Sequence, residues 1–528
     1  MKRLVAAALP PGLRNALSGK LRRLHGEHAI AARGFDRAFY LRNNPDVAAA
    51  GGDPLDHFMQ YGWREGRDPS PHFSVDAYLQ GFPEVAESGV NPFVHYLTSG
   101  RPVVRRRESP YGFRYEIIEA FRPVAERIPR APPPAAGGEA GLAAELGASR
   151  EGLARLHVTF SHDDYSANLG GLQASVRREA ERLAELGRDH LHLYPARAWP
   201  VVRADGDVEP LGVVWNGRPV GIFSADAVAR ALRQACSGAA VGRSFAIHSL
   251  LGHRADEVGD ILAAAGLHAG VFWLHDFASL CAGFHLLRND VEDCAAPPPD
   301  SAACGICAYG PWRARHMAEH ARLFERLSLT VAAPSQATLE LWTRSAPFAA
   351  ARTVVLPHAE LVARGPAPVA EDGPFRLAYA GLPVSHKGWP IFRSLAVRFA
   401  DDLRYEFLHL GARGDPTLPV KFQEVGSGMA AALEAARPDA VLVWPLCRET
   451  FSFVAYEAVA AGCAVVTGPD SGNVQAFVTE TGAGAVLADE TALGAAFETG
   501  EILALGRARR RPMLHDLRYG ALTLDLPA

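Results

Sequence analysis

Long apolar runs are missing from this sequence. No stretch approaches the ~18–20 continuous apolar residues that a membrane-spanning helix needs, so we expect no membrane span. The segment 1–30 has a basic start and a short apolar patch that ends at Pro10 and Pro11. We interpret it as a surface helix and not as a signal peptide, because no cleavage site follows a long enough apolar region. These features predict a cytoplasmic protein.

An excess of charge is missing as well. The 54 Lys and Arg residues nearly balance the 58 Asp and Glu residues, and the net charge is -4. This balance offers no basic surface for nucleic acid, which we exclude as a partner. Two short basic runs, Arg105–Arg107 and Arg509–Arg511, are typical of solvated faces, but they leave peripheral contact with an anionic inner membrane face open.

Cysteine is scarce, and its count of seven is odd, which argues against a disulfide framework. Four of the seven, Cys281, Cys294, Cys304 and Cys307, nevertheless fall in one Pro-rich segment and end in a C-x2-C pair. Four thiolates form a closed tetrahedral zinc site, so we predict a structural zinc ion here. Free thiols or a disulfide in a loop remain the alternative. No base is evident beside them, so a catalytic cysteine is not expected.

An internal repeat occupies residues 31–110, where two units are offset by 38 residues. The matching positions are Phe35, Tyr40, Leu41, Pro45, Val47, Pro54, His57 and Gly62, which recur as Phe73, Tyr78, Leu79, Pro83, Val85, Pro92, His95 and Gly100.

Each repeat unit is expected to be a small helical hairpin. Asp53-Pro54 and Asn91-Pro92 look like helix starts, with a capping side chain followed by proline in the first turn. His57 and His95 occupy matching positions, and we interpret them as core or capping residues and not as ligands.

The remaining chain divides at shifts in composition. A Pro- and Gly-rich linker is expected at 111–150, and alternating apolar strands and helices follow it. The predicted domains are an N-terminal helical segment 1–30, the repeats 31–110, the linker 111–150, a Rossmann-like domain 151–360 with a Cys-rich insertion 281–307, a second Rossmann-like domain 361–510 and a tail 511–528.

Two series of buried strands define the α/β class. The first series comprises 156–160, 190–194, 245–250, 271–275 and 329–333, and the second comprises 376–381, 405–411, 440–444 and 463–468. Two such series predict two similar sheets that face each other, and ligands of such sheets bind at the carboxyl ends of the strands.

Two motifs stand where a phosphate could bind. Gly170 and Gly171 lie between the first strand and a long amphipathic helix, whose N-terminal amides are free to meet an anion. Lys387 follows the strand at 376–381 and can neutralise a phosphate as a point charge. Taken singly, the two glycines are equally compatible with a tight turn that binds no ligand, and an isolated lysine is by default a surface residue before a helix.

The sharpest motif is CRETFSFVAYEAVAAG, which holds Glu449 in a loop and Glu457 in the following helix. Ser452 is expected to cap that helix and to leave amides near Phe451–Val454 free for a phosphate. Ionised carboxylates accept hydrogen bonds only, which suits the vicinal diols of a sugar and a ribose. Two unrelated surface glutamates are the alternative.

Four elements occur together in order: the Gly170-Gly171 turn, Lys387-Gly388, Glu449 with Glu457, and the loop Ser471-Gly472-Asn473. This combination resembles the retaining glycosyltransferases of family four, which have the two-domain GT-B fold with the active site between the domains. The resemblance covers roughly residues 155–500. The N-terminal repeats resemble modules attached to bacterial surface-polysaccharide glycosyltransferases.

The resemblance implies a role for each matched residue. Glu449 would hold the donor sugar, Glu457 the ribose and Lys387 the diphosphate, while His275 corresponds to a family histidine near the reacting sugar. The same resemblance implies that the donor-binding set is Gly170, Gly171, Lys387, Phe451, Ser452, Phe453 and Glu457, and that the catalytic set is His275, Lys387 and Glu449.

Two positions depart from the family pattern. Leu382 stands where the family has an arginine, and Ser452 stands where it commonly has glycine. The implied activity is transfer of a sugar from a nucleotide donor to a glycan or lipid-linked acceptor with retention, in cell-surface polysaccharide synthesis. No Asp-x-Asp clamp stands at a strand end, so no catalytic metal is expected. A non-catalytic scaffold of the same fold, which Leu382 favours, and a nucleotide-sugar epimerase remain alternatives.

Overall fold

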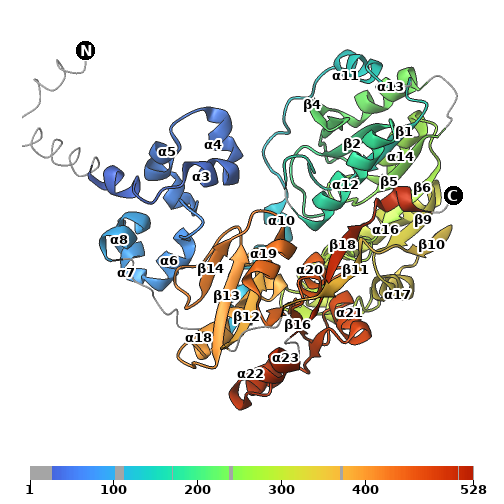
Figure 1. Cartoon of the computed structure of the whole chain (residues 1–528). Helices are drawn as coiled ribbons and strands as arrows, with labels where there is room; N and C mark the ends of the chain where they lie inside the picture. The colour runs from blue at the N-terminus through green and yellow to red at the C-terminus, as the bar shows by residue number, and fades with distance from the viewer. Residues whose placement is uncertain are drawn as a thin grey trace, which may run out of the picture. The chain divides into compact units, whose positions relative to one another are not determined.

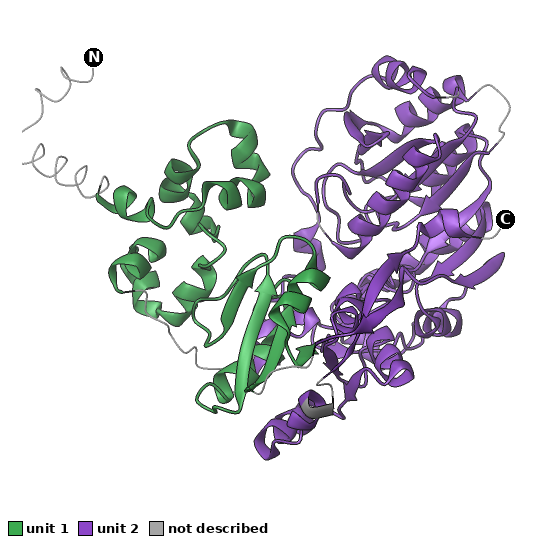
Figure 2. Cartoon of the chain, viewed as in Figure 1, with its two compact units in different colours: residues 1–110, 371–384, 389–442 green, residues 111–370, 385–388, 443–528 purple. Residues whose placement is uncertain are grey.

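The computed structural model describes residues 26–100, 112–150, 152–168, 170–236, 242–368, 373–508 and 511–526. The first part of segment 1–30 and the basic runs, except Arg511, lie outside these ranges. Figure 2 shows two compact units: unit 1 comprises 1–110, 371–384 and 389–442, and unit 2 comprises 111–370, 385–388 and 443–528.

Unit 1 begins with the two repeats, and each consists of three short helices instead of the expected hairpin (Figure 1). The helices are α3 Arg37–Asn43, α4 Pro45–Ala50, α5 Pro54–Gln60, α6 Val75–Gly81, α7 Pro83–Ser88 and α8 Pro92–Thr98, with a 3-10 turn η2 at Gly62–Glu65.

The predicted caps are confirmed. The side chain of Asp53 accepts hydrogen bonds from the first amides of α5, and Asn91 does the same for α8. Each capped helix then presents a histidine to the tyrosine of its own repeat: Tyr40 Oη lies 3.0 Å from His57 Nδ1, and Tyr78 Oη lies 2.8 Å from His95 Nδ1. The two histidines are therefore structural partners of buried tyrosines.

Unit 1 also contains four parallel strands in the order β14-β13-β12-β15. Their bounds are β12 Phe375–Ala380, β13 Tyr405–Gly411, β14 Lys421–Glu424 and β15 Ala440–Leu442, with helices α18 Trp389–Arg398 and α19 Met429–Ala436.

The second repeat contacts the β13–β14 region of the same unit. The Gly414 amide donates to the Pro71 carbonyl at 2.7 Å, and Arg413 Nη1 lies 3.0 Å from a carboxylate oxygen of Asp68. His72 meets the Phe422 ring edge to face at 5.5 Å. The repeats are thus joined to the α/β part of unit 1 by hydrogen bonds, an ion pair and ring contact.

Unit 2 is built on an eight-stranded sheet in the order β10-β9-β6-β5-β1-β2-β3-β4 (Figure 1). Its strands are β1 Leu156–Phe160, β2 Asp189–Pro195, β3 Leu211–Trp215, β4 Arg218–Phe223, β5 Ser244–Ile247, β6 Ala269–Trp273, β9 Ser328–Ala333 and β10 Arg352–Val355. The pairs β2–β3 and β3–β4 are antiparallel and the other pairs are parallel.

The helices between these strands have apolar residues that recur on one face, which is the face that each helix buries. In α12, Gly171–Glu185, the buried positions Val176, Glu179 and Leu183 lie about one turn apart, so a carboxylate is buried together with the apolar stripe. The other helices of unit 2 that precede residue 350 are α9 Phe113–Glu119, α10 Val124–Arg127, α11 Glu139–Gly147, α13 Ala225–Ala235, α14 Ala255–Ala264, α15 Ala302–Gly305, α16 Gly310–Arg326 and α17 Gln336–Ser345; a two-stranded ribbon, β7 Leu287–Arg288 and β8 Glu292–Asp293, lies in the Cys-rich insertion.

The later part of unit 2 comprises β11 Ala359–Pro366, η3 Ser385–Lys387, α20 Phe453–Ala460, β16 Ala464–Thr467, α21 Asn473–Thr481, β17 Gly484–Val486, α22 Glu490–Thr499, α23 Leu503–Ala508, β18 Met513–Tyr519 and η4 Leu522–Asp525. The segment expected as a tail therefore contains a strand, β18, which pairs antiparallel with β11. The segment expected as a linker contains α11, whose Leu142 and Leu146 join the main hydrophobic core.

The predicted α/β class with parallel sheets is confirmed, and every strand of the two predicted series is present. Pairing of two sheets face to face stays a prediction. Within the described ranges, no helix combines the length and apolar character needed to span a bilayer.

Candidate active site

Glu449 lies in a loop that hydrogen bonds hold from two directions. The Thr450 hydroxyl donates to the His275 carbonyl at 2.8 Å, and the Ser335 hydroxyl donates to the Thr450 carbonyl at 2.8 Å. Thr338 donates a second hydrogen bond to that carbonyl at 3.2 Å. The loop that carries Glu449 is therefore fixed to the segments that follow β6 and β9.

Lys387 lies beside Glu449, although 62 residues separate them in the sequence. Its ammonium nitrogen is 2.5 Å from Glu449 Oε1, and the two side chains are 44% and 11% exposed. Burial alone would lower the pKa of Lys387, but the neighbouring carboxylate reverses this and raises the pKa above its ordinary value. Lys387 therefore stays charged, and an anion can approach it from the exposed side.

Gly388 explains how the lysine reaches this position. Its φ is +88°, and a Cβ atom at this position would lie 2.1 Å from the Trp444 carbonyl oxygen. The turn is held further by the Leu446 amide, which donates to the His386 carbonyl at 2.9 Å. A larger residue at 388 would push Lys387 away from the segment around Trp444.

The N-terminus of α20 is not capped by the side chain of its N-cap residue, Ser452. Ser452 holds the expected cap position but has φ +69°, and its hydroxyl makes no capping hydrogen bond. The expected serine cap is therefore wrong: the position requires left-handed backbone, which glycine adopts without strain. The first amides of α20 have no partner from this side chain and can meet an anion.

Phe451 and Phe453 flank this turn in different ways. Phe451 is 3% exposed and stacks on Tyr456 with ring centroids 4.3 Å apart, so it supports the turn from within. Phe453 stacks on His358 at 5.8 Å. A Cβ added to Gly171 would lie 3.5 Å from Phe453, so the predicted Gly170-Gly171 turn and the start of α20 are neighbours.

Glu457 lies one turn into α20 near a cation that the sequence did not indicate. Burial raises the pKa of Glu457 to about 7, although the nearby Arg178 acts to lower it. The Arg178 guanidinium lies 3.8 Å from the centre of the Tyr519 ring and 5.2 Å from that of Phe453. It makes no hydrogen bond or ion pair with any described residue, so its N–H groups are available to a ligand.

His275 ends a chain of hydrogen bonds. Its Nε2 lies 2.9 Å from Nδ1 of His248, whose Nε2 lies 3.0 Å from the buried carboxylate of Glu179. Burial, together with the neighbouring His358 and His248, holds the pKa of His275 well below its ordinary value, so the ring is neutral at pH 7. Neither His248 nor Glu179 was singled out from the sequence. The one signal available was a polar residue at a position where the apolar pattern predicts burial.

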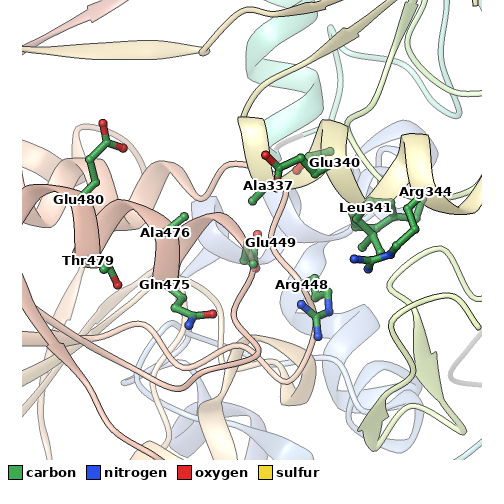
Figure 3. Close-up of a pocket in the computed structure, with 13 residues that line it drawn as sticks. Ala337, Glu340, Leu341, Arg344, Arg448, Glu449, Gln475, Ala476, Thr479 and Glu480 are labelled. Atoms are coloured by element: carbon green, nitrogen blue, oxygen red, sulfur yellow. The ribbon is translucent and has the colours of Figure 1, made fainter.

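A cavity of about 480 Å³ opens beside Glu449. Figure 3 shows Glu340, Leu341 and Arg344 of α17 on one side of the Glu449 loop and Thr479 and Glu480 of α21 on the other.

The predicted residues are thus brought together in part. Lys387 contacts Glu449, Gly171 lies next to Phe453, and Thr450 joins the Glu449 loop to His275. The residues that line the 480 Å³ cavity include Glu449 but neither Lys387 nor Glu457. A single pocket shared by the two glutamates and the lysine stays a prediction.

The four clustered cysteines are free thiols, and all of them line one small cavity of about 20 Å³. Arg313 Nη1 donates to Cys304 Sγ at 2.9 Å. Within the described part of the chain, no three Cys, His, Asp or Glu side chains are arranged to hold a metal ion. The structure does not show the tetrahedral cage that the spacing predicts, and zinc stays a prediction.

An uncapped helix N-terminus, a lysine and two glutamates are the groups that a site for a phosphorylated, hydroxyl-rich ligand would use. No family model matches the sequence. No curated protein matches it either.

Three of the solved structures that match over part of the chain are a sucrose-phosphate synthase, HepE and a glycosyltransferase. Sucrose-phosphate synthase from Thermosynechococcus elongatus is 15% identical, with a TM-score of 0.42, 67% of this chain covered and 93% of that one. Anabaena HepE in complex with UDP and glucose is 13% identical, with a TM-score of 0.41 and the same coverages, 67% and 93%. A glycosyltransferase from Rickettsia africae is 11% identical, with a TM-score of 0.42 and coverages of 67% and 92%. At such low identity and TM-score, the likeness assigns neither a family nor an activity to this chain.

Proposed function

We propose that this protein is a glycosyltransferase that uses a nucleotide-sugar donor. The observation that carries the proposal is the contact of Lys387 with Glu449 at 2.5 Å, next to the uncapped start of α20. Lysine neutralises a phosphate, whereas a carboxylate accepts hydrogen bonds from sugar hydroxyls. A ligand that needs both groups side by side carries a phosphate bonded directly to a sugar.

Each group has a place in the proposed donor complex. The diphosphate lies at the first amides of α20, with Lys387 as one cation. Arg178 supplies the second cation, in place of the arginine that Leu382 replaces. Glu449 accepts from hydroxyls of the transferred sugar, and Glu457 accepts from the ribose diol.

The proposed reaction breaks the bond between the anomeric carbon and the diphosphate oxygen. The electron pair leaves with the nucleoside diphosphate, where Lys387, Arg178 and the α20 amides stabilise the growing negative charge. The acceptor hydroxyl attacks from the face of the leaving group, so the configuration is retained. Its proton passes to the departing phosphate oxygen, and no separate base is required.

The proposed acceptor is a glycan or a lipid-linked sugar in cell-surface polysaccharide synthesis, and the proposed location is the cytoplasm or the inner face of the membrane. The support is the resemblance of the 38-residue repeats to modules of such enzymes. In unit 1 the repeats contact the β13–β14 region through Asp68, Pro71 and His72. That contact holds the repeats in a fixed position beside the α/β part of unit 1. We propose that they dock a polymer there.

Donor binding tests the proposal directly. A thermal-shift screen with UDP-glucose, UDP-N-acetylglucosamine, GDP-mannose and dTDP-rhamnose, followed by calorimetry, should find a donor that binds. Glu457→Ala should weaken that binding, and Glu449→Ala should mainly lower turnover. Glu185→Ala is the matched control, because Glu185 is 65% exposed in a surface ion pair with Arg182. Absence of binding by the whole panel would refute the proposal.

A non-catalytic scaffold is the second candidate, and Leu382, which is 54% exposed, favours it. Such a scaffold would bind the donor without releasing nucleoside diphosphate from it. Turnover that depends on Arg178 would favour the enzyme over the scaffold, since Arg178 would then perform the role of the missing arginine. Arg178→Gln should lower turnover by roughly tenfold or more.

We also propose that the cysteine cluster binds structural zinc. Backbone N–H groups of Gly283 and Ala296 donate to the sulfurs of Cys281 and Cys294, which favours thiolates. Burial nevertheless raises the pKa of Cys281 to about 11, so the metal-free thiol is protonated and zinc must displace protons.

Elemental analysis of the purified protein tests the zinc proposal. It should find about one zinc per chain. Cys304→Ser with Cys307→Ser should abolish that content, and Cys236→Ser, outside the cluster, should leave it unchanged. A folded protein without zinc would reject the site.

A further inference from the structure

Three buried groups from separate elements form one hydrogen-bonded chain. Glu179 comes from the middle of α12, His248 directly follows β5, and His275 follows β6. Glu179 Oε2 lies 3.0 Å from His248 Nε2, and His248 Nδ1 lies 2.9 Å from His275 Nε2. Glu179 and His248 are 0% and 1% exposed, so water does not compete for these contacts.

The charge of Glu179 sets the direction of the hydrogen bonds. Burial would raise the pKa of Glu179, but the hydrogen bonds from His248 and Thr523, together with the neighbouring His248 and His157, outweigh burial and lower the pKa below its ordinary value. An ionised carboxylate only accepts, so His248 must donate from Nε2. When only Nε2 of His248 carries a proton, its Nδ1 accepts, and the proton of that contact lies on Nε2 of His275. Nδ1 of His275 is left with its lone pair.

Ring contacts fix the orientation of His275. Its ring is stacked on Trp273 at 5.5 Å and on His358 at 5.1 Å, with interplanar angles of 18° and 27°. Its carbonyl accepts the Thr450 hydroxyl at 2.8 Å, which joins the chain to the loop that carries Glu449. Nδ1 makes no hydrogen bond to any described residue, so it is free to accept from a ligand.

The far end of the chain is also satisfied. Glu179 Oε1 accepts from the Thr523 amide at 3.2 Å, and Trp273 Nε1 donates to the Thr523 hydroxyl at 3.0 Å. The same residue of η4 therefore holds the carboxylate and the ring that stacks on His275. The links between Glu179, His248 and His275 specify one arrangement, because a broken link leaves a buried polar group unpaired.

We propose that Glu179 and His248 are positioning residues that hold His275 as the Nε2–H tautomer, with Nδ1 ready to accept a hydrogen bond from a hydroxyl of the donor sugar. This inference rests on the proposed function for the identity of the ligand. The tautomer itself is a property of the free protein and can be measured without a donor.

Substitutions at position 248 separate the two links. His248→Gln places an amide near the former Nε2, so it keeps Glu179 partnered and loses the link to His275. His248→Asn places an amide near the former Nδ1 and should restore part of that link. His157 provides the matched control: it is also buried, with Nε2 3.6 Å from Glu179, but its Nδ1 binds the Ser244 hydroxyl at 2.7 Å.

Nitrogen-15 NMR of histidine-labelled, deuterated protein tests the tautomer. His275 in the unmodified protein should carry its proton on Nε2, and the shift pattern should change in His248→Gln and Glu179→Gln but not in His157→Gln. The groups that face His275 are His248, His358 and His162, and all of them must be assigned before its titration is followed. A proton on Nδ1 of His275 would overturn the inference whatever the enzyme does.

Kinetics with the best donor of the four-member panel provide the second measurement. His248→Gln should lower kcat roughly tenfold, the size of one buried hydrogen bond, with KM changed much less and the acid limb of the pH profile displaced. His248→Asn should recover part of kcat, and His157→Gln should match the unmodified protein. If the unmodified protein turns over a donor and His248→Gln equals His157→Gln, the positioning role fails while the proposed function stands.

Discussion

At the scale of single residues, two positions near the start of α20 have an unusual backbone conformation or an unusual pKa. Ser452 adopts φ +69°, a conformation that costs a residue with a Cβ atom free energy. Glu457 is buried enough that its pKa lies at about 7. Both features can be measured by single substitutions.

Replacing Ser452 with glycine should raise the stability of the protein. Glycine adopts the left-handed region without the Cβ clash, and Ser452 has no capping hydrogen bond to lose, so we expect a gain of about 0.5–1 kcal/mol. The thermal unfolding midpoint measures it. Ser224→Gly is the control of opposite sign, because Ser224 has φ -68° and caps α13 by accepting from the Ala227 amide. A lower midpoint for Ser452→Gly would contradict the strain.

Donor affinity should increase as pH rises through about 7. An ionised Glu457 accepts from both hydroxyls of a diol, whereas the protonated acid has one oxygen that carries an O–H donor. The raised pKa leaves Glu457 largely protonated at pH 6 and largely ionised at pH 8. Between these limits the affinity should rise about tenfold. Calorimetry with an intact nucleotide sugar is suitable because the phosphodiester does not titrate there. Glu457→Gln should bind weakly at both pH values, and a pH-dependent Glu457→Gln would assign the titration to another group.

At the scale of elements, the repeats are joined to the α/β part of unit 1 by few but specific contacts. Asp68 is 8% exposed and accepts from both Arg413 and the Val75 amide at the start of α6. Burial raises the pKa of Asp68 to about 6, against the attraction of Arg413. The charge that Arg413 must balance is therefore present above about pH 6 and absent well below it.

Arg413→Ala should loosen the repeats in a pH-dependent way. Because the folded pKa of Asp68 is raised above the unfolded value, folding favours its protonated form, and that contribution is lost as pH rises from about 4 through 6. Without Arg413, an ionised Asp68 is buried unpaired, so the repeats should lose more stability at pH 8 than at pH 5. Hydrogen exchange of residues 68–98 measures it. Arg42→Ala is the control, since Arg42 and Glu424 form an exposed pair at 3.5 Å; equal effects at both pH values would exclude the Asp68 charge as the cause.

At the scale of the whole chain, the C-terminal residues complete unit 2. β18 pairs with β11, and Tyr519 in β18 stacks against Arg178. Thr523 in η4 contacts both Glu179 and Trp273. A segment that reads as a tail in the sequence is therefore part of the candidate site.

Truncation after residue 512 should destabilise the protein strongly and abolish donor binding. It removes every β11–β18 hydrogen bond, exposes the underlying apolar surface and leaves Glu179 without one partner. Thr523→Val, in the full chain, keeps the amide and loses only the hydroxyl that accepts from Trp273, so its cost should be about 1 kcal/mol. Thermal unfolding compares the three proteins. A truncated chain that melts like the full one would show that β18 and η4 are dispensable.

The local elements could be predicted from short patterns of residues. The strands of the two predicted series, the caps at Asp53 and Asn91 and the paired repeats follow from apolar periodicity and capping chemistry, which act over a few residues. The motif residues Lys387, Glu449 and Glu457 were visible from their places after predicted strands and in the helix that follows.

The contacts between groups that are distant in the chain could not be predicted in this way. Arg178 lies next to Tyr519, Glu179 is bound to His248, and Lys387 contacts Glu449, although each pair is far apart in the chain. The pairings β2–β3 and β11–β18 and the left-handed Ser452 were missed likewise. Such contacts depend on how sheets and helices pack, and packing free energy belongs to surfaces assembled from many segments, which no short stretch of sequence contains.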